Sequence, residues 1–181
     1  MADIPTLETE RLRLRPYRLA DFEDYARMWS EPDVVRFIGG AVFTREQSWG
    51  RFLRLAGLWH YLGFGFFAIE HKATGAFAGE CGFHDMRRNV VPSLEGTMET
   101  GWALTPPMQG QGLAEEAVRA AIGWAGQNAS RDRLTCMIDT GNAASLRVAA
   151  KLGFVEFARA LYNGEPIVLL DRPRLPASAA D

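Results

Sequence analysis

The chain has 181 residues, of which 48% are hydrophobic and 23% charged, and its formal net charge at pH 7 is -2. This length and composition predict one compact domain with a sizeable core and disfavour an intrinsically disordered chain. The nearly balanced charge gives no general attraction to nucleic acid or to an anionic membrane, so we expect neither as a partner.

Two cysteines, Cys81 and Cys136, lie far apart in apolar segments. Their number and spacing disfavour a disulfide framework, and the three histidines are scattered without ligand spacing, so we expect no metal. The N-terminal residues contain no apolar signal-peptide core, and no segment has the uninterrupted apolar length of a transmembrane helix. The expected location is the cytoplasm.

The first half of the chain predicts a strand, two helices and an antiparallel meander. Leu12 and Leu14 alternate with arginines, as in a strand exposed on one side, and a helix is expected over residues 20–30. Thr44, with Gln47 three residues later, predicts a capping box at the start of a second helix. Three successive strands are then expected at 64–71, 76–85 and 98–104.

The second half predicts alternating helices and strands. Helices are expected from Gly112 to about Gln127 and over 142–152, and strands over 133–139, from Phe154, and near 165–171. Together these elements predict a mixed α/β (α+β) fold, with a central sheet of about six to seven strands and helices on both faces. We expect a single domain over 1–172 and a flexible tail over 173–181.

A glycine-rich turn, "PPMQGQGLAEEAV", occupies residues 106–118 between an expected strand and an expected helix. The first N–H groups of a helix lack intrahelical partners and carry partial positive charge, so such a turn is suited to holding phosphate oxygens. The alternative is a tight turn whose glycines only permit unusual backbone angles. A dinucleotide fingerprint would require a third glycine at Glu115, and a Walker loop would require Gly-Lys-Ser/Thr, so both are disfavoured.

Gln109, Gly112 and Ala114 match the Gln/Arg-x-x-Gly-x-Gly/Ala signature, and on them the chain resembles the GNAT superfamily of acetyl-CoA-dependent N-acetyltransferases. The later segment "NAASLRVAAKLGF" is similar to the Asn-x-x-Ser … Lys-Leu-Gly-Phe segment of that superfamily. The opening "TERLRLRPYRLADFEDYARMWSEPDVVRFIGG" resembles the branch that acetylates ribosomal-protein N-termini. The resemblance covers roughly residues 6–172 and implies a mostly antiparallel sheet.

The resemblance also implies where coenzyme A binds. The pantetheine arm would pair with the edge of the strand Gly101–Leu104, and a strand N–H near Trp102 or Ala103 would hold the thioester carbonyl. Asn142 would contact the coenzyme near its thiol, or would cap the following helix, or both. The complete set of expected coenzyme contacts is Trp102, Ala103, Leu104, Gln109, Gly110, Gln111, Gly112, Leu113, Ala114, Glu115 and Asn142.

Candidate catalytic groups lie on the expected meander and on the last helix. Glu80 and Glu99 are on adjacent strands, with His84 on the same face as Glu80, so either glutamate could accept a proton through water. Two carboxylates on a strand pair are expected to raise a pKa toward neutrality. Both glutamates could instead be solvated strand residues. Arg87 and Arg88, in the following polar loop, are expected to be solvated.

For the acid, many members of the superfamily use a tyrosine where this chain has Ala149, which departs from the pattern. The resemblance to the ribosomal-protein branch assigns protonation of the leaving thiolate to Ser145, which could instead only cap its helix. The expected function is transfer of an acetyl group from acetyl-CoA to a primary amine, on a protein N-terminus or a small molecule. The family resemblance is also compatible with a homodimer. A non-catalytic acyl-CoA-binding module and a dinucleotide-dependent oxidoreductase are the alternatives.

Overall fold

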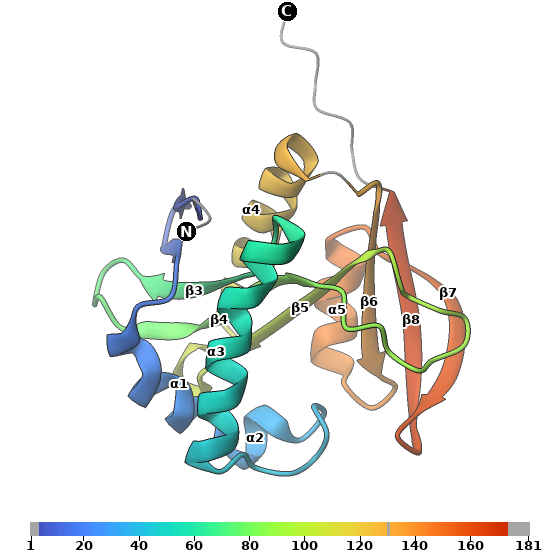
Figure 1. The fold of residues 1–181 in the computed structure, drawn as a ribbon, viewed down its shortest axis with the longest axis horizontal. Helices are drawn as coiled ribbons and strands as arrows, with labels where there is room; N and C mark the ends of the chain where they lie inside the picture. Colours follow the sequence, from blue (N-terminus) through green and yellow to red (C-terminus); the bar gives the residue numbers. More distant parts are fainter. Residues whose placement is uncertain (1–3, 130, 174–181) are drawn as a thin grey trace, which may run out of the picture.

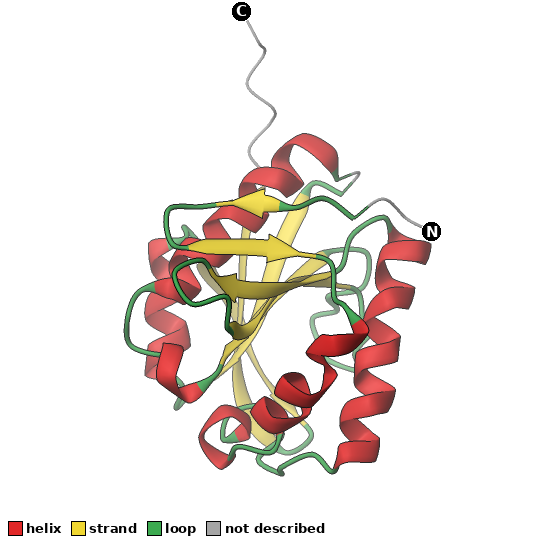
Figure 2. Ribbon diagram, turned by 90° about the vertical axis from the view of Figure 1, so that its left-hand side faces the viewer, coloured by secondary structure: helices red, strands yellow, loops and turns green. Residues whose placement is uncertain are grey.

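A mixed sheet runs through the molecule and separates two layers of helices (Figure 1; Figure 2). The computed structural model describes residues 4–129 and 131–173. The sheet has eight strands in the order β1-β2-β3-β4-β5-β6-β8-β7, and every neighbouring pair is antiparallel except β5 and β6. The strands are β1 (Leu7–Glu8), β2 (Leu12–Arg15), β3 (Phe66–His71), β4 (Phe77–His84), β5 (Met98–Leu104), β6 (Arg133–Asp139), β7 (Val155–Tyr162) and β8 (Glu165–Pro173).

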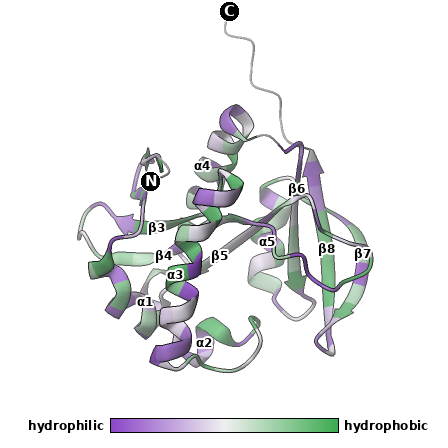
Figure 3. Cartoon of the chain, in the orientation of Figure 1, coloured by the Kyte–Doolittle hydropathy of each residue, from purple (hydrophilic) through white to green (hydrophobic). Residues whose placement is uncertain are grey.

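In the described parts of the chain, five α-helices cover the two faces of this sheet. Figure 2 shows one layer, made by α1 (Phe22–Trp29), α2 (Pro32–Val35) and α3 (Arg45–Leu62), on the opposite side of the sheet from α4 (Leu113–Asn128) and α5 (Ala143–Lys151). Short 3₁₀ turns precede α1 and α4 at Leu19–Asp21 and Pro106–Met108. Figure 3 shows hydrophobic and hydrophilic residues interspersed along α3 and α4, as expected of helices with one side against a sheet.

The predicted fold class is confirmed, and the elements that differ are short ones. The sheet has an eighth strand, β1, whose two residues are too few for an alternating pattern. The predicted capping box is confirmed, since Thr44 Oγ1 accepts from the N–H of Gln47 at 3.2 Å and Gln47 Oε1 accepts from the N–H of Thr44 at 2.8 Å. Of the predicted tail, residues 174–181 lie outside the described residues, and Pro173 ends β8.

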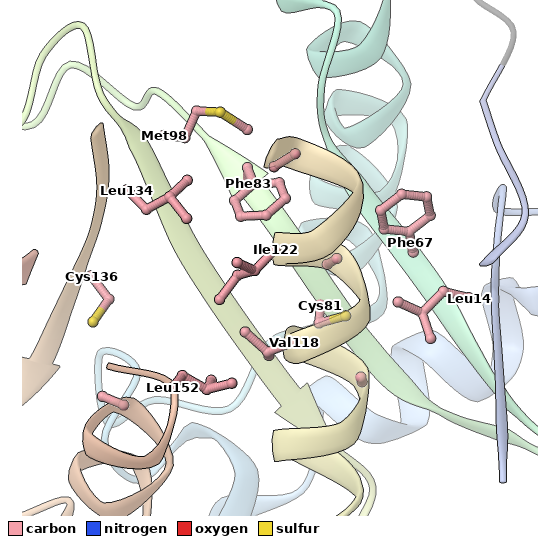
Figure 4. Close-up of a cluster of buried hydrophobic side chains, with 14 of the residues drawn as sticks. Leu14, Phe67, Cys81, Phe83, Met98, Val118, Ile122, Leu134, Cys136 and Leu152 are labelled. Atoms are coloured by element: carbon pink, nitrogen blue, oxygen red, sulfur yellow. The ribbon is translucent and has the colours of Figure 1, made fainter. Parts of the chain in front are cut away.

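Each face of the sheet has its own apolar core. On the α4 side, Phe67, Cys81, Phe83 and Met98 pack with Val118 and other residues of α4 (Figure 4). On the other side, α1 and α3 pack onto β3 to β5 through the residues Phe22, Tyr25, Trp29, Phe52, Phe66 and Ala103. Because side chains alternate along a strand, residues next to Cys81 and Phe83 in sequence point toward α1 and α3. That side of the sheet is called the α1–α3 face below.

No described helix combines the length and apolar character that a membrane span requires.

Candidate functional site

The predicted glycine turn leads from the end of β5 into α4. Gly110 and Gly112 have φ angles of 73° and 77°, in the left-handed region that glycine adopts readily. Gly112 is the N-cap of α4 and has no side chain to accept hydrogen bonds from the first helical N–H groups. The first backbone hydrogen bond of the helix runs from Glu116 to the carbonyl of Gly112. Its first N–H groups are thus available to an anion.

Two side chains fix the position of this turn. The side-chain amide of Gln109 donates to the carbonyl of Leu104, at the end of β5, at 3.0 Å. Arg11, which follows β1, donates to the carbonyl of Gln111 at 3.0 Å and forms an ion pair with Glu116 at 2.6 Å. Nothing in the local sequence around Arg11 indicates this contact, because it joins residues about 100 positions apart.

The parallel strands β5 and β6 separate soon after they meet (Figure 1). Their register contains two residue pairs, Met98 with Leu134 and Glu99 with Thr135, and no further pair within the described chain. The other edge of β5 is paired with β4 as far as Leu104. The last residues of β5 therefore have one unpaired edge, which we call the open edge of β5.

Two contacts show which backbone groups point to the open edge. A Cβ added to Gly79 of β4 would clash with the carbonyl oxygen of Ala103, so Ala103 points its backbone groups toward β4. The carbonyl of Leu104 accepts from Gln109 instead. Since backbone groups alternate between the two edges of a strand, the N–H groups of Trp102 and Leu104 face the open edge.

Glu80, on β4, is buried on the α1–α3 face and is already paired. Its side chain is 1% exposed, accepts from the hydroxyl of Tyr17 at 2.7 Å, and forms an ion pair with Arg51 of α3 at 2.5 Å. The Arg51 guanidinium in turn lies over the ring of Trp29, 4.2 Å from its centroid. Burial, reinforced by the neighbouring Glu80 charge, raises the pKa of Tyr17 well above its usual value. Tyr17 therefore remains a hydroxyl donor to Glu80 at neutral pH.

Glu99, on β5, is also buried on this face and is paired with different residues. Arg88 Nε donates to both carboxylate oxygens, at 2.9 and 2.8 Å, and His84 Nε2 lies 3.2 Å from Oε1. Arg88 also donates to the hydroxyl of Tyr162 at 3.1 Å. Burial alone would raise the pKa of Glu99, but the hydrogen bonds and charges of His84 and Arg88 outweigh it and lower this pKa to about 2.

Two expectations from the sequence are wrong here. The pKa of Glu99 is lowered, not raised, because each glutamate has its own arginine and the two carboxylates do not share a site. Arg88 is not a solvated loop residue, since it is largely buried against Glu99, whereas Arg87 is exposed as expected. The ion pair between Arg51 and Glu80 could not be predicted from the sequence, because α3 and β4 come together only in the folded protein.

Asn142 and Ser145 lie together at the start of α5, beyond the end of β6. Asn142 Oδ1 accepts from the N–H of Ser145 at 3.0 Å, which confirms the capping interpretation of Asn142. An ideal Cβ on the neighbouring Gly141 would lie 3.4 Å from the ring of Phe37, so the loop after α2 reaches this turn. Ala149, at the position of the family tyrosine, is fully buried in the core.

The arrangement brings the glycine turn, Asn142 and Glu80 to the diverging end of the strand pair, whereas Glu99 and His84 lie toward the other end of β5, where β5 and β6 still pair. The glycine turn follows the carboxyl end of β5, and Asn142 follows the carboxyl end of β6. Parallel strands end at the same edge of a sheet, and ligands of open sheets bind outside such ends. Glu80, Glu99 and His84 lie on the α1–α3 face of the neighbouring strands. Among the described residues, no three His, Cys, Asp or Glu side chains gather as a metal-binding group.

Comparison with known proteins agrees with this geometry. A family model described as an acetyltransferase (GNAT) domain matches residues 11–155. A Bordetella pertussis protein assigned to the GnaT family of acetyltransferases is 32% identical, with a TM-score of 0.83 over 93% of this chain and 99% of its own. The uncharacterized N-acetyltransferase p20 of Bacillus licheniformis is 28% identical over 150 residues, 82% of each chain.

A more distant structure shares the fold alone. RimL, a ribosomal L7/L12 alpha-N-protein acetyltransferase whose structure is a complex with coenzyme A, is 16% identical to this chain. It superposes with a TM-score of 0.76 over 93% of this chain and 98% of its own.

Proposed function

Because the chain belongs to the acetyltransferase (GNAT) family and is an acyltransferase, we propose that it transfers an acetyl group from acetyl-CoA to a primary amine, on a protein N-terminus or a small molecule. The observation that carries the proposal is the open edge of β5 with the glycine turn directly after it. One ligand with an extended arm followed by a pyrophosphate fits both features. The buried free thiols of Cys81 and Cys136 suit a reducing compartment, so the proposed location is the cytoplasm.

In this proposal the coenzyme lies along the two features in order. The N–H groups of Gln111 to Glu115 hold the pyrophosphate at the start of α4. The pantetheine arm pairs with the open edge of β5, as an added strand would. The thioester carbonyl accepts from the N–H of Trp102, which the alternation of β5 favours over Ala103 for this role. Asn142 contacts the coenzyme near its thiol while it caps α5.

The amine nitrogen attacks the thioester carbon and forms the new N–C bond. The C–S bond then breaks, so the coenzyme departs as a thiolate and the acetyl group stays on the amine. A protein α-amine, with a pKa near 7.7 to 8.0, is already about a tenth neutral at pH 7, whereas a lysine amine is neutral to less than about a thousandth. We propose Glu80 or Glu99 as the proton acceptor, through water. With a pKa of about 2, Glu99 is a weak acceptor, so this role falls first to Glu80. Because both glutamates are already paired with arginines, the site suits an α-amine better than a lysine.

The departing thiolate needs little assistance, because a thiol has a pKa of about 8.5. Ser145 is proposed to pass its hydroxyl proton to it while regaining a proton from solvent. The backbone N–H of Ser145 donates to Asn142, which fixes the start of α5 just after the carboxyl end of β6.

The direct test is coenzyme-thiol release measured with acetyl-CoA and a panel of N-terminal peptides, free amino acids, polyamines and aminoglycosides. An amine-free reaction corrects for hydrolysis. Release that depends on one class of amine supports the proposal and identifies the acceptor class. If no amine gives release while acetyl-CoA still raises the melting temperature, the chain is a non-catalytic acyl-CoA-binding module, an alternative prompted by Ala149.

A further inference from the structure

Three arginines lie around the two buried glutamates of the α1–α3 face. Arg51 and Arg54 are one turn apart on α3, and Arg88 comes from the loop between β4 and β5. Glu80 neutralises Arg51, and Glu99 neutralises Arg88. Arg54 is exposed and has no hydrogen bond or ion pair within the part of the chain that the structure describes. The cluster therefore carries one positive charge in excess.

Arg54 is close enough to the other two arginines for their positive charges to repel it. Partial desolvation of its guanidinium, followed by the charges of Arg51 and Arg88, lowers the pKa of Arg54, although Tyr25 acts in the opposite direction. An anion next to Arg54 would relieve this repulsion, whereas a second cation would increase it. The electrostatics of this face thus disfavour a polyamine acceptor and favour a negatively charged one.

Hydrogen-bonding groups that lack partners surround Arg51. Among the described residues, the Tyr25 hydroxyl, Trp29 Nε1 and Arg51 Nε are buried without a hydrogen-bond partner. Tyr25 and Trp29 are less than 2% exposed, and their ring centroids lie 6.2 Å apart. Trp29 Nε1 and Arg51 Nε can only donate, whereas the Tyr25 hydroxyl, which also interacts with the Arg51 guanidinium, can donate or accept; buried donors without an acceptor are unfavourable and uncommon in folded proteins. An oxygen that carries no proton, and so only accepts hydrogen bonds, would satisfy these donors.

A carboxylate meets both requirements. It supplies an anionic partner for Arg54. Its two oxygens accept hydrogen bonds from several donors, in the geometry that a guanidinium prefers. We propose that the acceptor is a primary amine that also carries a carboxylate, which binds Arg54 and the unpartnered donors around Arg51 while the amine points to the open edge of β5. This inference rests on the proposed acetyl transfer and names its substrate class.

Two kinds of acceptor share this chemistry, namely a free amino acid with its α-carboxylate and a peptide that begins with an acidic residue. The experiment therefore has two arms. One compares an amino acid with its carboxamide, and the other compares peptides that begin with Asp or with Asn. The steady-state constants kcat and KM are measured with acetyl-CoA for each pair, in the natural protein and in Arg54→Gln.

We expect Arg54→Gln to raise KM about tenfold for the carboxylate member of the preferred pair and to leave kcat and the neutral member unchanged, as for loss of one charge-assisted contact. Comparing the two proteins on the same substrate cancels the different basicity of the two amines. Arg54→Lys should restore part of the affinity. Arg45→Gln is the matched control, since Arg45 is an exposed arginine of the same helix that pairs with Glu23.

The arm in which the effect occurs identifies the source of the carboxylate. If Arg54→Gln changes both members of each pair equally, or if neither pair shows a dependence on the carboxylate, this inference is wrong while acetyl transfer to amines stands. If no amine is acetylated although coenzyme binds, the proposed function fails, and the inference fails with it.

Discussion

At Gly112 the backbone has a φ of 77°, and an ideal Cβ there would meet only the Arg11 guanidinium, at 3.7 Å. Apart from its chain neighbours, no other described atom lies within 4 Å of that position. A side chain here is strained by the backbone angle, and an acidic one would also place negative charge where the pyrophosphate belongs.

We therefore predict that Gly112→Asp weakens acetyl-CoA binding at least about tenfold, through like-charge repulsion at the helix start. Isothermal titration of the variant with acetyl-CoA measures this loss. Gly123→Asp is the matched control, because it adds the same charge to an open position in the middle of α4 and should bind normally. Unchanged affinity in Gly112→Asp would refute the pyrophosphate site.

Ser145 is predicted to contribute only modestly to the rate. Because a thiolate is a good leaving group, Ser145→Ala should lower kcat by no more than about tenfold and leave the Kd of acetyl-CoA unchanged. The helix cap survives in this variant, since Asn142 bonds the backbone N–H of residue 145 and not its hydroxyl. Complete loss of turnover with coenzyme binding intact would show that the hydroxyl does more than protonate the thiolate.

Glu99 links stability to pH. Its pKa falls from the ordinary 4.5 to about 2 in the folded protein, so its ionised form stabilises the fold above about pH 4.5, and this contribution is lost as the pH falls toward 2. In Glu99→Gln this titration is absent. The difference in unfolding free energy between the two proteins should shrink by about 3 kcal/mol over that range. Chemical denaturation at several pH values measures it, and a constant difference would contradict the pairing with Arg88 and His84.

At the scale of elements, the two edges of β5 are predicted to respond differently to proline, which has no N–H group. The N–H of Trp102 faces the open edge, so Trp102→Pro should keep the β4 ladder and fold. It should lower kcat by about a hundredfold, as removal of one oxyanion donor does. Trp102→Ala controls for the lost ring and should retain most of the rate.

Ala103→Pro is the opposite case, because the backbone of Ala103 points toward β4. It should destabilise the sheet, which circular dichroism and the melting temperature would record. If Trp102→Pro lost its fold and Ala103→Pro kept it, the assignment of the open edge would be reversed.

The longer elements were predictable from sequence because each carries its own local signal. The capping box of Thr44 and Gln47 and the alternation around Glu80 needed no knowledge of distant residues. β1 and α2 were missed because two and four residues are too short for a periodic pattern. The divergence of β5 from β6 was also beyond the sequence, since α4 separates the two strands along the chain and their register is set only in the folded protein.

At the scale of the whole molecule, the difference between the predicted and observed site lies in charge pairing. The sequence put His84 on the face of Glu80 and Glu99 on the adjacent strand, and in the structure all three lie on the α1–α3 face. Which arginine reaches each glutamate depends on how α3 and the β4–β5 loop fold over that face. This pairing turned a predicted pair of bases into two neutralised carboxylates, and it left Arg54 as the unpaired charge.

The open edge of β5 also bears on the solubility of the protein. Unpaired strand edges are where chains add to one another and aggregate, and natural sheets usually protect them. The pantetheine arm is proposed to bind along this same edge, so bound coenzyme would shield the edge from other chains, and its release would expose the edge again. A ligand at 100 times its Kd adds about 2.7 kcal/mol of stability by mass action. Protein stored with acetyl-CoA should therefore stay monodisperse longer than protein freed of it, and the supply of substrate would help to maintain the enzyme itself.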